Sequence, residues 1–121
     1  MKRAGWVWLT AWSVGVAGCG GALENETVSA PEGEDAAMRA RSQHARVVAL
    51  EGEARRAAEA ARCDDACVAS DEACALASQI CGAADADAHD EGTRLLCEDA
   101  SPRCETARSV AASGCVCAAA R

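Results

Sequence analysis

The sequence predicts an all-α fold, a small disulfide-stapled helical hairpin with an additional N-terminal helix. Three observations support this prediction. Residues 36–62 are a run of strong helix formers, mainly Ala, Arg and Glu. From residue 63 onward, several cysteines recur seven positions apart, which is nearly two helical turns. Large aliphatic side chains are sparse, so a domain of this size needs covalent cross-links to stay folded.

The first nineteen residues have the order of an export signal. A basic start, Met1-Lys2-Arg3, is followed by small or apolar residues 4–18 and then by Val16-Ala17-Gly18-Cys19. This ending resembles the lipobox of bacterial lipoproteins. The resemblance implies that residues 1–18 are a signal peptide that is removed. It also implies that Cys19 becomes the N-terminus and carries lipid, palmitate included, which anchors the chain in a membrane.

Two other interpretations of this segment are weaker. A transmembrane helix needs about 20 apolar residues, more than this stretch offers. An ordinary secretory signal would leave Cys19 as a free thiol. The chain has nine cysteines, an odd number, and assigning Cys19 to lipid leaves eight that can all pair.

The residue after the lipidated cysteine influences sorting in Gram-negative lipoproteins. Gly20 resembles the outer-membrane default, so an outer-membrane location is favoured over the inner membrane. The mature part also resembles uncharacterised Ala- and Cys-rich lipoproteins of GC-rich proteobacteria, a resemblance that implies no activity.

Residues 19–35 predict a lipidated cysteine followed by a flexible tether, because Gly, Pro, Ser and acidic residues dominate without periodicity. Residues 36–62 predict one helix with Asp35 as its N-cap. Small side chains repeat along one face of this helix, at Ala40, Val47, Ala54 and Ala61. The stripe predicts a helix lying on the cysteine-rich part; a coiled-coil dimerisation segment is the alternative.

Residues 63–117 predict the Cys-rich helical hairpin, and residues 118–121 a C-terminal tail. We expect one helix from 65 to 81, ended by Gly82, then a polar loop and a second helix from Thr93. Pro102 either kinks this second helix or opens a further one.

The eight remaining cysteines predict a nested ladder of disulfides. Cysteines seven apart on one helix are separated by ~10.5 Å, too far for a bond that needs Cα atoms within ~4.4–6.8 Å. They must therefore reach across a hairpin centred near His89, in which paired residue numbers have a nearly constant sum. That sum is 178 for Cys81–Cys97 and for Cys74–Cys104, 182 for Cys67–Cys115 and 180 for Cys63–Cys117.

The same residues argue against several functions. Removing Lys2 and Arg3 leaves ten arginines against nineteen Asp and Glu, a net charge of −9, which disfavours nucleic acid as a partner. With two histidines, no nucleophile motif and no Gly-rich phosphate loop, we expect neither an enzyme nor a cofactor.

The sequence therefore predicts a membrane-anchored cell-envelope protein with a structural or interaction role and a protein partner. A periplasmic metal-binding protein is the alternative. Its ligands would be Cys115 and Cys117 or the acidic loop, which contains Asp85, Asp87, His89, Asp90 and Glu91.

Overall fold

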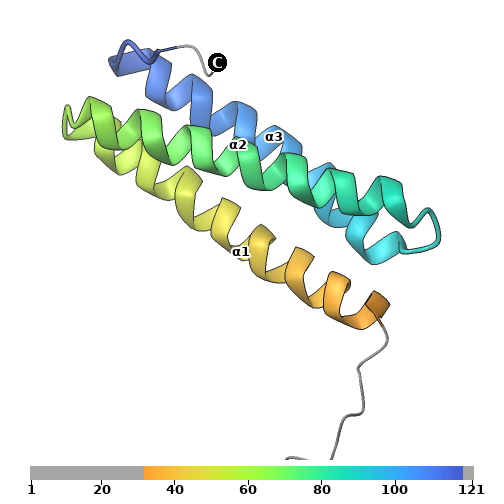
Figure 1. Ribbon diagram of the computed structural model, residues 1–121. Helices are drawn as coiled ribbons and strands as arrows, with labels where there is room; N and C mark the ends of the chain where they lie inside the picture. Colours follow the sequence, from red (N-terminus) through yellow and green to blue (C-terminus); the bar gives the residue numbers. More distant parts are fainter. Residues whose placement is uncertain (1–31, 119–121) are drawn as a thin grey trace, which may run out of the picture.

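Three helices pack side by side in the computed structural model, which describes residues 32–118, and each runs antiparallel to the one before it (Figure 1). They are α1 (Glu32–Glu59), α2 (Cys63–Ala86) and α3 (Glu91–Gly114). Each helix contacts the other two. The all-α class predicted from the sequence is confirmed: α2 and α3 form the disulfide-linked hairpin, and α1 is the additional N-terminal helix.

Helix α1 begins four residues earlier than predicted, at Glu32. The last residues assigned to the tether are therefore helical, and Asp35 lies within the first turn instead of capping it. Acidic side chains there are favourable because they face the positive end of the helix dipole. The helix ends at Glu59, and Ala61 lies exposed in the turn to α2 with a φ of 57°.

Helix α2 continues past Gly82, so the predicted end at that glycine is wrong. Gly82 has no positive φ, and the alanines after it are strong helix formers that continue the helix to Ala86. Asp87 ends the helix with extended backbone, at a φ of −133°. The connection to α3 is thus the short stretch 87–90, which contains His89 as predicted.

Helix α3 runs without interruption through Pro102, so no further helix opens there. Its start is capped by Asp90, whose carboxylate accepts a hydrogen bond from the Thr93 N–H at 3.0 Å. A proline inside a helix costs one backbone hydrogen bond. Disulfides at Cys97 and Cys104 hold both halves of α3 against α2 and so offset this loss.

The core consists of three small clusters arranged along the bundle. Among residues 32–118, the large aliphatic side chains that are fully buried are Val47, Leu50 and Ile80. Alanines provide most of the remaining contacts, which lets the helix backbones approach closely but removes little apolar area from water. The scarcity of large buried side chains explains why this fold depends on disulfides.

Candidate functional site

Four disulfides join α2 to α3 and to the segment after it, with Cα–Cα distances between 4.7 and 5.5 Å. Cys81–Cys97 and Cys74–Cys104 are paired as the constant-sum argument predicts. The two outer pairs are exchanged relative to the prediction. The bonds are Cys63–Cys115 and Cys67–Cys117, where the sequence argument gave Cys67–Cys115 and Cys63–Cys117.

The exchange follows from the direction of the chain after α3. Cys63–Cys115 has the same sum, 178, as the two inner pairs, because α3 stays helical and in register up to Gly114. Cys115 is extended, with φ −137° and ψ 152°. The segment then turns back along α2, and Cys117 meets Cys67, one helical turn after Cys63. The nested prediction assumed that the chain would continue in the direction of α3.

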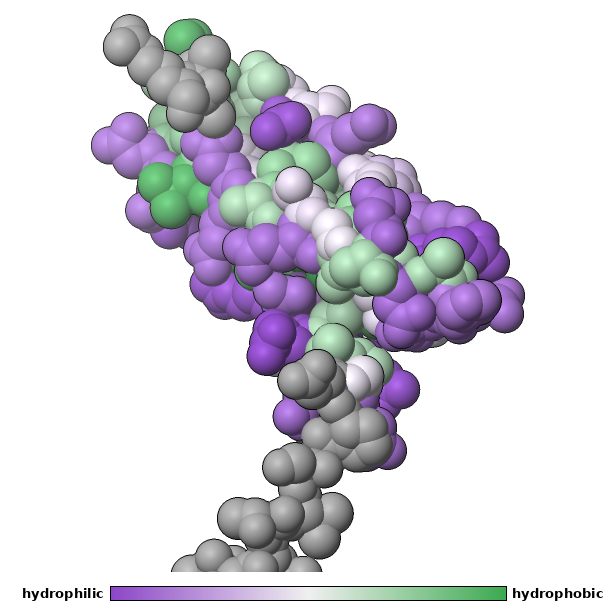
Figure 2. All heavy atoms as spheres, turned by 45° about the vertical axis from the view of Figure 1, so that its right-hand side comes forward, coloured by the Kyte–Doolittle hydropathy of each residue, from purple (hydrophilic) through white to green (hydrophobic). Residues whose placement is uncertain are grey.

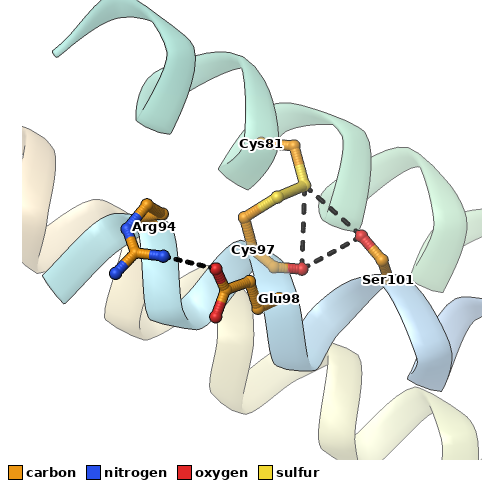
Figure 3. The surroundings of a disulfide bond; sticks show 5 residues. All are labelled: Cys81, Arg94, Cys97, Glu98 and Ser101. Atoms are coloured by element: carbon orange, nitrogen blue, oxygen red, sulfur yellow. Dashed lines mark hydrogen bonds and ion pairs between the residues drawn. A yellow bond between two sulfur atoms is a disulfide. The ribbon is translucent and has the colours of Figure 1, made fainter. Parts of the chain in front are cut away.

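The Cys81–Cys97 bond lies beside a serine of the next turn of α3 (Figure 3). The Ser101 hydroxyl donates to the Cys97 carbonyl at 3.0 Å, and its oxygen lies 3.5 Å from Cys81 Sγ. Both cysteines are half-buried, whereas Cys74 and Cys104 are buried. The disulfides therefore differ in their access to solvent.

Oxidation of the cysteines bears directly on the metal-binding alternative. Cys115 and Cys117 are both in disulfides, so neither presents the thiolate that a soft metal ion requires. In residues 32–118, no group of three or more His, Cys, Asp or Glu side chains is arranged to hold a metal ion. The metal-binding alternative gains no support at the terminal cysteines.

The acidic loop is organised as a helix cap. Asp87 accepts a hydrogen bond from the His89 N–H at 3.1 Å, and Asp90 accepts one from the Thr93 N–H. The Thr93 hydroxyl also donates to Asp90, and these bonds lower the pKa of the Asp90 carboxyl below its usual value. Glu91 forms an ion pair with Arg94 at 3.2 Å. The structure thus uses these carboxylates to start α3, and Asp85 lies exposed on the last turn of α2.

A polar network that the sequence analysis did not identify joins α1 to α3. Asp99 Oδ2 lies 2.6 Å from His44 Nε2 and 2.6 Å from Arg103 Nε, while Arg103 also reaches Glu51 at 2.9 Å. Hydrogen bonds from Arg103 and His44 lower the pKa of Asp99, and those to Asp99 and Glu51 raise the pKa of Arg103. The seven-residue spacing of His44 and Glu51 puts both side chains on one face of α1, but nothing in the sequence indicates their partners on α3.

A shallow groove of about 450 Å³ runs between α1 and α2. Its floor is made by Leu50, Ala57 and Ala69, and its rim carries three arginines and three carboxylates. Arg46 bridges Glu53 and Glu72, and Arg62 pairs with Asp65, so most of the rim charge is neutralised internally. Hydrophilic residues likewise cover much of the molecular face in Figure 2, with hydrophobic residues between them. This groove lacks the convergent unpaired polar groups typical of a small-molecule site.

Cys19 and the residues that resemble a lipobox lie outside the described residues, as does most of the predicted tether. Within residues 32–118, no helix has the length and hydropathy needed to cross a bilayer. Comparison with known protein families, curated proteins and solved structures finds no match to this chain.

Proposed function

We propose that this chain is a cell-envelope lipoprotein with a structural or interaction role and no catalytic activity. Residues 1–18 are the signal peptide, Cys19 carries the lipid, and the three-helix module is held outside the cytoplasm. Gly20 favours the outer membrane as its location.

One observation carries the proposal: eight of the nine cysteines are paired, and the remaining one is Cys19. Disulfides persist in oxidising compartments outside the cytoplasm. An unpaired thiol would be a liability there, but Cys19 follows Val16-Ala17-Gly18, in the position of a lipidated cysteine. The same assignment accounts for both the export-like start and the odd cysteine count.

The geometry favours interaction over catalysis. About half of the carboxylates in the described residues lie in helix caps and ion pairs, and most of the charge on the rim of the groove between α1 and α2 is neutralised. Helix α1 begins at the same end of the bundle as the α2–α3 connection, whereas the segment after α3 lies at the opposite end (Figure 1). Val116 in that segment is exposed and offers an apolar side chain to a partner.

The absence of lysine after Lys2 gives a sharp test of processing. If residues 1–18 are removed and the new N-terminus is acylated, the mature protein has no primary amine. The full-length chain should be purified from membranes, treated with an amine-reactive ester, and weighed by intact mass spectrometry. We expect lipid mass on Cys19, loss of residues 1–18 and no label. An unlipidated mass, or label on both Met1 and Lys2, would contradict the proposal.

Two pairs of variants supply the controls. Cys19→Ser should abolish both lipid addition and processing, whereas Ser29→Ala, in the predicted tether, should change neither. Gly20→Asp should move the protein from the outer to the inner membrane fraction, whereas Gly20→Ala should leave the distribution unchanged. If Gly20→Asp has no effect, the outer-membrane assignment fails while the lipid assignment stands.

A further inference from the structure

Apart from the chain connection at residues 60–62, helix α1 is held to the rest of the molecule by noncovalent contacts. It contains no cysteine, and all four disulfides lie within residues 63–117. Its buried face offers only two large side chains, Val47 and Leu50, beside three alanines. The side-chain polar contacts from the described part of α1 to the hairpin are Gln43–Gln79, His44–Asp99, Arg46–Glu72 and Glu51–Arg103. The α2–α3 hairpin is therefore closed by covalent bonds, whereas α1 can separate from it without breaking a disulfide.

The turn between α1 and α2 contains a strained residue. Ala61 has a φ of 57°, in the left-handed region where its Cβ crowds the backbone carbonyl. Two hydrogen bonds close this turn, from the Ala61 N–H to the Ala58 carbonyl at 3.1 Å and from the Arg62 N–H to the Ala57 carbonyl at 2.8 Å. Opening the turn relieves the strain at Ala61, and short strained connections favour the exchange of elements between copies.

The end of the bundle that holds this turn differs from the rest in charge. We call residues 55–67 and 108–118 the junction end; it carries four arginines and three carboxylates. The other described residues carry five arginines and fourteen carboxylates. Two copies therefore repel one another over most of their surface but not at the junction end. Val116, which is 99 % exposed, also lies there because its neighbours are bonded to Cys63 and Cys67.

We propose that two copies of this chain exchange α1. The turn at Ala61 opens, each α1 packs on the hairpin of the other copy, and the two junction ends meet. Every contact between α1 and the hairpin is kept, since the two copies are identical. The dimer gains the contact between junction ends, which covers Val116, and loses the strain at both Ala61 residues. A second copy is favoured over an unrelated helix because α1 already has the complementary side chains.

Charge reversal across the α1–α3 contact tests the exchange. Full-length Glu51→Arg and Arg103→Glu chains are each purified with disulfides intact, mixed, incubated in a moderate urea concentration that detaches α1, and returned to buffer. In a closed monomer of either variant, the side chains at positions 51 and 103 carry the same charge and repel each other. In a heterodimer that exchanges α1, position 51 of each copy meets position 103 of the other copy, and both of these contacts join opposite charges. We expect native mass spectrometry to find heterodimer at roughly tenfold above its statistical proportion.

Two controls make the result specific. The double variant Glu51→Arg with Arg103→Glu restores the pair within one chain, and mixing it with either single variant should give no enrichment. Ala61→Gly removes the strain in the closed turn, so we expect it to weaken the dimer by about tenfold in Kd. Monomers alone at the highest concentration measured, heterodimer only in the statistical proportion, or a dimer unaffected by Ala61→Gly would each overturn the proposal.

Discussion

Replacing Leu50 by alanine tests how α1 is held. Leu50 is 1 % exposed and packs in a cluster with Ala54, Ala69, Ala73 and Ala107. The substitution removes three carbons, worth about 2.4 kcal/mol of transfer free energy at ~0.8 kcal/mol per carbon. Alanine neighbours are too short to fill the cavity, so the total loss of stability should be about 3–4 kcal/mol.

This loss of stability is large compared with the free energy that the buried side chains of α1 contribute to its packing on the hairpin. Val47 and Leu50 are its fully buried large side chains, and together they contribute about 3–6 kcal/mol. We therefore expect hydrogen exchange in α1 to accelerate by ~10²–10³-fold, leaving α1 less protected than the disulfide-closed hairpin.

The measurement is amide hydrogen exchange resolved by peptide, compared with urea unfolding followed by circular dichroism. Val48→Ala is the matched control, because its side chain is 41 % exposed on the same helix, and its effect should stay within about 0.5 kcal/mol. Equal exchange rates in all three helices of the variant would refute the view that α1 detaches by itself. A loss no larger than that of the control would refute the energy estimate.

Three further predictions concern the hairpin. Replacing both Cys81 and Cys97 by alanine opens the shortest covalent loop, with a sequence separation of 16, and should lower the free energy of unfolding by about 3 kcal/mol in urea titrations. Pro102→Ala restores a backbone donor inside α3 and should raise the unfolding free energy by roughly 2–3 kcal/mol, measured in the same titrations. The pKa of Asp99 is lowered by Arg103, so its contribution to stability is present above the unfolded-state pKa and is lost as the pH falls through the folded-state value. Unfolding midpoints measured from pH 6 down to acid pH should therefore fall less steeply for Asp99→Asn than for the unaltered protein.

The register of the hairpin can be predicted from the sequence because helical spacing limits which cysteines can meet. The sum that fixes Cys81–Cys97 and Cys74–Cys104 also fits Cys63–Cys115, but the nested ladder pairs Cys115 with Cys67, which is wrong. Their pairing depends on the reversal of the chain at Cys115, which is a tertiary feature that no local pattern encodes. Once the chain reverses, Cys117 lies beside Cys67, the cysteine of α2 that is still unpaired.

Helix ends and polar contacts were less predictable than helix faces. Glycine is only a weak stop signal, and Gly82 stays helical because the residues after it favour the helix. The buried positions at Ala40, Val47 and Ala54 follow from periodicity alone. The partner of His44, Asp99, cannot be predicted from periodicity, because it depends on which helix lies beside α1 and on how the two helices are aligned along their axes.

The path of the covalent bonds also determines how the molecule responds to mechanical load. A pulling force applied between Glu32 and residue 118 passes from Cys63 to Cys117 by two covalent routes, one through Cys115 and one through Cys67. Residues 68–114 of the hairpin lie outside both routes and bear none of the tension. Within the part of the chain that the structure describes, α1 and its turn are then free to unravel, which would lengthen residues 32–62 to roughly 100 Å. The bundle thus combines one extensible helix, α1, with a disulfide-linked hairpin that does not extend under load.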